Sequence, residues 1–126
     1  MGDIEILLID DEEDYSDTMG FYLKAKGYRV RACPSGADGI LEIRRERPDI
    51  VFLDFMMPGM DGAETLGKIR EMDASLPVIM VTSYAVEDRM EAARRSGISA
   101  IFPKGADFSE AAKMISEALK CLKREP

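Results

Sequence analysis

Polar side chains stand directly after four apolar runs of this sequence. Asp10 and Asp11 follow the first run, and Asp54, Thr82 and Lys104 follow three later ones. Three carboxylates held close together repel one another, so they must take up protons or bind a cation. Oxygen ligands favour Mg²⁺, which keeps part of its hydration shell and prefers carboxylates together with a phosphate. If the fold brings these residues to one edge, we expect a magnesium site there.

The same residues could also carry out a reaction. Asp54 is a candidate nucleophile, because carboxylates form aspartyl-phosphates. A phosphoryl group on Asp54 would need its oxygens neutralised. Mg²⁺ could neutralise one oxygen and the Lys104 ammonium another, while the Thr82 hydroxyl and backbone N–H groups could serve the third. Phosphoryl transfer to Asp54 is therefore the chemistry that this residue set favours.

Alternating apolar runs and helical patterns predict how these residues are placed. The third and fourth runs are apolar on both faces, as in buried parallel strands. The second run alternates, with Arg29 and Arg31 on its polar side, which favours a sheet edge. We expect a doubly wound α/β fold with five parallel strands in the order 2-1-3-4-5, right-handed crossovers and five helices. The predicted strands cover Ile4–Ile9, Tyr28–Cys33, Ile50–Leu53, Val78–Val81 and Ile98–Phe102.

Helix signals fill the intervals between the strands. Asp61 is expected to cap the third helix, and Asp107 or Ser109 the last one. Gly27 and Gly97 stand where helices should end. Apolar stripes at helical spacing indicate the faces that pack on the sheet. The first stripe includes Tyr15, Met19 and Tyr22, and the last includes Phe108, Ala111, Ile115, Ala118, Leu119 and Leu122. In such folds ligands bind at the carboxyl ends of the strands, near the point between strands one and three where the order reverses.

Length and composition exclude several classes of protein. The 126 residues fit one domain covering residues 1–126, and a net charge of −7 argues against direct binding of nucleic acid or an anionic membrane surface. No apolar run approaches the length of a membrane span and Met1–Ile9 lacks the apolar core of a signal peptide, so a cytoplasmic location is expected. Cys33 and Cys121 are expected to be reduced and half-buried. The sequence has no histidine, which excludes histidine-based catalysis.

Over almost its full length the chain resembles the receiver domain of two-component response regulators, which has a flavodoxin-like fold. The resemblance rests on Asp10–Asp11, on Asp54 within the segment DFMMPGMDG, on Thr82 and on Lys104. It implies that Asp54 accepts a phosphoryl group from a phosphohistidine on a sensor histidine kinase or phosphotransfer protein. It also implies that Thr82 and Lys104 contact that group, and that Mg²⁺ is held by Asp10, Asp11, Asp54 and the backbone carbonyl of Met56.

The resemblance leaves several partners open. An output domain after residue 126, a separate downstream protein and a homodimer are all compatible with the sequence. A partner surface is expected on the fourth helix, the fifth strand and the fifth helix. Charged side chains of the fourth helix include Glu87, Asp88, Arg89, Glu91, Arg94 and Arg95.

The same residues also allow other interpretations. Glu12, Glu13 and Asp14 are interpreted as acids that favour a helix start, and the methionines after Asp54 as filler, since thioethers do not suit Mg²⁺. A flavin site would need a phosphate-binding loop where this chain has acids. A phosphatase would need a general acid near Asp54, and Met56 stands at the expected position. A receiver-like interaction module that is not phosphorylated remains the main alternative.

Three departures from the family pattern lead to specific predictions. Gly105 follows the lysine where proline is usual, so we predict a trans Lys104–Gly105 bond and expect the glycine to supply backbone freedom. Ile101 replaces the usual aromatic switch residue, and Phe102 should face the other side of the strand. Met56 and Tyr84 flank the expected route of hydrolytic water, which predicts slow loss of the phosphoryl group.

Overall fold

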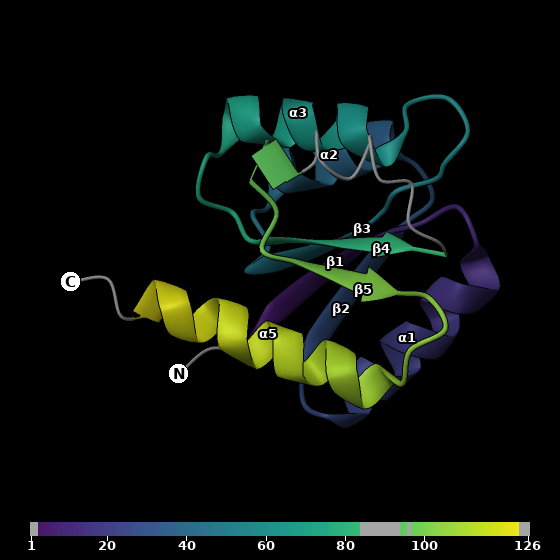
Figure 1. Cartoon of the computed structure of the whole chain (residues 1–126), viewed down its shortest axis with the longest axis vertical. Helices are drawn as coiled ribbons and strands as arrows, with labels where there is room; N and C mark the ends of the chain where they lie inside the picture. Colours follow the sequence, from purple (N-terminus) through teal and green to yellow (C-terminus); the bar gives the residue numbers. More distant parts are fainter. Residues whose placement is uncertain (1–2, 84–93, 96, 124–126) are drawn as a thin grey trace.

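The computed structural model describes residues 3–83, 94–95 and 97–123, with side chains up to residue 120. Strands and helices alternate along these residues (Figure 1). The strands are β1 (Glu5–Ile9), β2 (Arg29–Cys33), β3 (Ile50–Asp54), β4 (Val78–Thr82) and β5 (Ala100–Pro103). The helices are α1 (Glu13–Ala25), α2 (Gly36–Arg45), α3 (Gly62–Met72) and α5 (Phe108–Lys123).

The five strands form one parallel sheet in the order β2-β1-β3-β4-β5, as the sequence predicts. All residues of β1, β3 and β4 are buried, because helices cover both faces of the sheet there. Strand β2 lies at the edge and is exposed at Arg29 and Ala32. Its alternating pattern therefore predicted its position correctly.

The sheet separates two apolar layers (Figure 1). On the face that α2 and α3 cover, Leu7 and Leu53 pack with Leu66 and Ile69 of α3. The other face is covered by α1 and α5. Its buried side chains include Ile6, Leu8, Met19, Leu23, Phe52, Phe102, Ala111 and Ile115. Burying both faces of the strands fixes their register, because a slip of one residue would exchange the two layers.

Three of the predicted signals for helix ends are confirmed. Asp61 accepts a hydrogen bond from the backbone N–H of Glu64, whose side chain accepts from the N–H of Asp61 in return, forming a capping box. Asp107 accepts from the N–H of Ser109 at the start of α5. Gly27 follows the end of α1 with φ of 101°, a conformation that favours glycine. These contacts anchor the helices whose first turns border the strand ends.

Several boundaries and environments differ from the expectation. Strands β1, β2 and β5 start one or two residues later than predicted, and β3, β4 and β5 extend one residue further. Most of the predicted fourth helix lies outside the described residues, as do Tyr84 and the side chain of Cys121. Cys33 is a free thiol that is buried rather than half-buried. Within the described ranges, no helix has the length and apolar composition needed to cross a bilayer.

Candidate functional site

The strand register brings the predicted site residues to one edge of the sheet. Ile9 pairs with Leu53, so the residues that follow them, Asp10 and Asp54, emerge side by side. On the other side of β3, Asp54 pairs with Val81, next to Thr82 at the end of β4. Thr82 in turn pairs with Pro103 of β5, the residue before Lys104. The predicted convergence of these side chains is therefore present in the fold.

The Lys104 ammonium lies at the centre of this group. Its Nζ atom is 3.2 Å from Asp10 Oδ2 and 3.3 Å from Asp54 Oδ2, and it also contacts the Glu12 carboxylate. The Lys104 side chain is only 10% exposed, and those of Asp10 and Asp54 are 7% and 3% exposed. An ion pair at this depth is shielded from water, so its charges act on one another more strongly than surface charges do.

Burial changes the protonation of the site. Desolvation, together with the neighbouring Asp10 charge, raises the pKa of Asp54 to about 7, although Lys104 and the N–H of Met56 oppose the rise. Burial lowers the pKa of Lys104, but the carboxylates of Glu12, Asp10 and Asp54 outweigh it and the pKa rises overall. Lys104 is therefore a fixed positive charge, while Asp54 changes its charge near neutral pH.

Glu12 is the acid whose place the sequence interpretation missed. The sequence predicts an exposed acid at the start of α1, but the Glu12 side chain makes no capping hydrogen bond to that helix. Its carboxylate instead reaches Lys104, and one oxygen each of Asp10, Glu12 and Asp54 lie within 4.8 Å of one another. Asp11, predicted as a metal ligand, is exposed and lies outside that trio. The signal that the sequence offers is the place of Glu12 in the acid run, two residues after Asp10.

The loop after β3 is held against the site by backbone contacts. The N–H of Met56 donates to Asp54 Oδ1 at 3.2 Å, and Met56 is 41% exposed. The N–H of Gly62 donates to the carbonyl of Phe55 at 3.0 Å. A side chain at Gly62 would lie 2.6 Å from the backbone oxygen of Asp54, so only glycine allows α3 to start this close. The start of α3 therefore fixes the backbone that carries Asp54.

Thr82 and Lys104 are tied to each other through the backbone. The N–H of Lys104 donates to the carbonyl of Thr82 at 2.8 Å, and Thr82 is 5% exposed. The Lys104–Gly105 bond is trans, as predicted. The role expected for Gly105 is wrong, because its φ is not positive and an added side-chain carbon would contact nothing. The chain passes position 105 in a conformation open to other residues.

Ile101 and Phe102 face opposite sides of β5, as predicted. Ile101 packs with the layer under α2 and α3, and Phe102 with the layer under α1 and α5. No aromatic side chain therefore stands at position 101 to move toward Thr82. Among the described aromatic residues, Tyr15 of α1 reaches the site, with its ring centroid 4.9 Å from Lys104 Nζ. Burial raises the pKa of Tyr15 to about 12, so its phenol is neutral.

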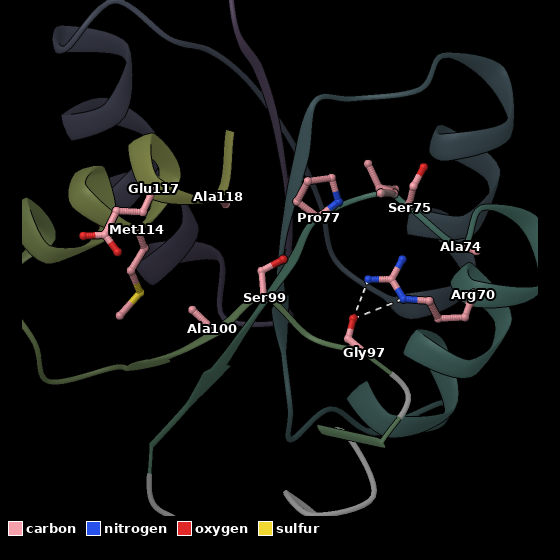
Figure 2. Close-up of a pocket in the computed structure, with 11 residues that line it drawn as sticks. Arg70, Ala74, Ser75, Pro77, Gly97, Ser99, Ala100, Met114, Glu117 and Ala118 are labelled. Atoms are coloured by element: carbon pink, nitrogen blue, oxygen red, sulfur yellow. Dashed lines mark hydrogen bonds between the residues drawn. The ribbon is translucent and has the colours of Figure 1, made fainter. Parts of the chain in front are cut away.

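A separate cleft lies at the other end of the strands (Figure 2). It has a volume of about 450 Å³ and is bordered by Pro77 and Ser99, which precede β4 and β5. Arg70 lies in it and donates to the carbonyl of Gly97 through Nε and Nη2, at 3.2 and 2.6 Å. None of the strand-end carboxylates lines this cleft. The carboxylates at the strand ends therefore lie away from this cleft.

Comparison with known proteins decides the family. The sequence model of the response regulator receiver domain matches residues 6–116. The chain belongs to the response regulator receiver domain family. A receiver domain protein from Methanospirillum hungatei, described as CheY-like, has the same fold, with a TM-score of 0.95 and 26% identity over 99% of this chain and all of that one.

Two relatives differ in how much of their own length this chain matches. Sporulation initiation phosphotransferase F of Bacillus subtilis is 30% identical over 84% of this chain and 86% of its own length. Transcriptional regulatory protein ZraR of Klebsiella oxytoca is 33% identical over 92% of this chain, which spans only 26% of ZraR. This chain is a phosphoacceptor receiver domain of two-component systems. Receiver domains bind Mg²⁺ at an acidic pocket and interact with histidine kinases.

Proposed function

We propose that Asp54 is the phosphoacceptor of this receiver domain. The observation that carries the proposal is the burial of Asp54 and Asp10 on either side of the Lys104 ammonium, with oxygens 3.3 and 3.2 Å from Nζ. In the transfer, an Asp54 oxygen attacks phosphorus, and the bond from phosphorus to the donor's nitrogen or oxygen breaks. Asp54 must be ionised to attack, and its pKa of about 7 leaves a large part of it ionised at neutral pH.

The donor set fits Mg²⁺. The converging groups are all carboxylate oxygens, which are the hard ligands that this cation prefers, and no described sulfur or nitrogen ligand joins them. We propose that Asp10, Asp11, Asp54 and the backbone carbonyl of Met56 hold the ion. When bound, Mg²⁺ would supply positive charge to the phosphoryl oxygens. Asp11 is exposed, so it would act from the solvent side of the site.

Lys104 and Thr82 are proposed to bind the phosphoryl group. Lys104 already lies beside Asp54, and Thr82 is linked to it by the backbone hydrogen bond of 2.8 Å. A movement of Lys104 toward phosphoryl oxygens would therefore displace the ends of β4 and β5 together. We propose that this displacement and a repacking of Ile101 shift the population of states that a partner recognises. The partner delivering the phosphoryl group would be a sensor histidine kinase or a phosphotransfer protein, and the receiver would act on a downstream protein or an output domain.

Incubation with acetyl phosphate and Mg²⁺, followed by intact mass measurement, tests the acceptor. We expect the gain of one phosphoryl group, lost in Asp54→Ala and retained in Asp38→Asn, a change at an exposed position of α2. Donor turnover without any mass gain would point to a phosphatase. Absence of any reaction would favour the alternative, an interaction module that is not phosphorylated, which Ile101 and Gly105 allow.

The lifetime of the phosphoryl group gives a second test. Met56 lies beside Asp54 and its thioether is apolar, so we propose that it shields the acyl phosphate from water. Met56→Asn should shorten the half-life measured after removal of the donor, since an amide can orient an attacking water. An unchanged half-life would remove Met56 from this role. The other proposed shield, Tyr84, lies outside the described residues.

A further inference from the structure

Among the described contacts of the Lys104 ammonium, the ring of Tyr15 is the one that carries no formal charge. Asp10, Glu12 and Asp54 surround the ammonium with carboxylates, and the Tyr15 ring lies 4.9 Å from it. A cation within about 6 Å of an aromatic centroid is attracted by the ring's quadrupole, more strongly where water is excluded. Lys104 is 10% exposed, so water competes little with this contact.

An aromatic cluster holds the Tyr15 ring in place. Phe108, the first residue of α5, lies 5.8 Å from Tyr15 in an edge-to-face arrangement with an interplanar angle of 66°. Phe108 also lies 5.8 Å from the ring of Tyr22 and stacks on Phe102 at 6.5 Å. The hydroxyl of Tyr15 is buried and has no hydrogen-bond partner among the residues that the structure describes. The phenyl ring, rather than the hydroxyl, is therefore the part of Tyr15 that acts on Lys104.

The two kinds of contact respond differently when the site is loaded. A cation bound to Asp10 and Asp54 neutralises part of their charge, which weakens their attraction for Lys104. The attraction of an uncharged ring is not reduced in this way. We propose that Tyr15 is a positioning residue that keeps the Lys104 ammonium beside Asp54 when Asp10 and Asp54 are engaged by Mg²⁺. This inference rests on the proposed function, because it assigns how the proposed phosphoryl-binding lysine is held.

Phosphorylation kinetics of matched variants test the proposal. In Tyr15→Leu we expect the acetyl phosphate concentration for half-maximal phosphorylation to rise about threefold to tenfold. Tyr15→Phe keeps the ring and should restore the wild-type value. Tyr22→Leu is the control for packing, since Tyr22 contacts the same Phe108 but has Lys26 over its ring instead of Lys104. Tyr22→Leu should leave the half-maximal concentration unchanged.

A double-mutant comparison separates positioning from general damage. Tyr15→Leu should have no further effect in a Lys104→Ala background, because its influence passes through the lysine. An equal loss in both backgrounds, or no loss in the wild-type background, would overturn the inference while leaving Asp54 as the acceptor. If wild-type protein gained no phosphoryl group, the proposed function and this inference would both be overturned.

A measurement on the unmodified chain covers the case in which Tyr15→Leu does not fold. The ε-methylene protons of Lys104 should show an upfield ring-current shift by NMR, assigned by its absence in Lys104→Ala. We expect the shift to persist at saturating Mg²⁺ and in Tyr15→Phe. Its disappearance on addition of Mg²⁺ would show that the ring does not hold the lysine in the loaded site, and would overturn the proposal.

Discussion

Asp54→Asn should stabilise the metal-free protein, and the gain should depend on pH. Asp54 is 3% exposed, and its pKa rises from an ordinary value of 3.8 to about 7. Asparagine has nearly the same shape, and its amide oxygen can still accept from the N–H of Met56. The substitution therefore removes a buried charge at little cost in packing.

The size of the effect follows from proton linkage. The pKa of Asp54 is higher in the folded than in the unfolded chain, so proton binding to Asp54 stabilises the fold. This stabilisation is fully present below pH 3.8 and is lost as pH rises through about 7. A tenfold change in proton affinity corresponds to about 1.4 kcal/mol, so ionising Asp54 costs about 4 kcal/mol of folding free energy at pH 8. At pH 5 the cost is about 2 kcal/mol, because the folded protein still holds the proton. Lys104 already opposes the pKa rise, so its attraction is included in these values.

Urea unfolding with a chelator present, at pH 5 and pH 8, measures the difference. We expect Asp54→Asn to exceed wild type in unfolding free energy at both values, with an advantage about 2–3 kcal/mol greater at pH 8. Asp38→Asn, on an exposed face of α2, should show no such trend. If the stability advantage of Asp54→Asn is the same at both pH values or is smaller at pH 8, the Asp54 carboxylate is not destabilised by burial as argued.

Three further predictions follow from the site. A proton competes with Mg²⁺ for Asp54, whose pKa is about 7, so Mg²⁺ affinity should fall about tenfold from pH 8 to pH 6. Calorimetry measures this affinity, and a value that does not change with pH would contradict the prediction. Glu12→Gln should speed phosphorylation by acetyl phosphate up to about fivefold, because Glu12 competes with the phosphoryl group for Lys104 and is largely exposed, whereas Glu13→Gln should not. Gly62→Ala should lower the free energy of unfolding by about 1–3 kcal/mol, while Gly105→Ala should be neutral in the same denaturation assay.

The sequence was most informative where burial dictates residue type. Strands β1, β3 and β4 are buried along their whole length, so their apolar runs predicted both their positions and the parallel sheet. The polar face of β2 predicted the edge. Once the strand order was inferred, Asp10, Asp54, Thr82 and Lys104 had to meet, because neighbouring parallel strands end together. These parts of the site were predictable from the order of apolar runs and polar residues along the sequence.

Side-chain placement within the first turn of α1 was not predictable. Asp11, Glu12 and Glu13 are consecutive acids with the same local preference for a helix start, and the sequence does not show which one turns toward Lys104. Tyr15 belongs to an apolar stripe of α1. Its spacing in that stripe is the same whether the ring packs in the core or contacts Lys104, so the sequence does not distinguish the two. Gly105 was misinterpreted for a similar reason. A glycine indicates that positive φ is allowed, but only the path of the chain shows whether it is used.

The crowding of acids around one ammonium also dictates an order of events. With Lys104 engaged by three carboxylates, the edge of the sheet repels any anionic phosphate compound that approaches it. A divalent ion would offset the excess of carboxylate charge over the single ammonium, so we expect the donor to dock productively only after the ion has bound. Rapid-mixing experiments should therefore show a lag when the chain meets donor and magnesium together, and none after preincubation with the metal. A lag of equal length under both regimes would mean that the two ligands load independently.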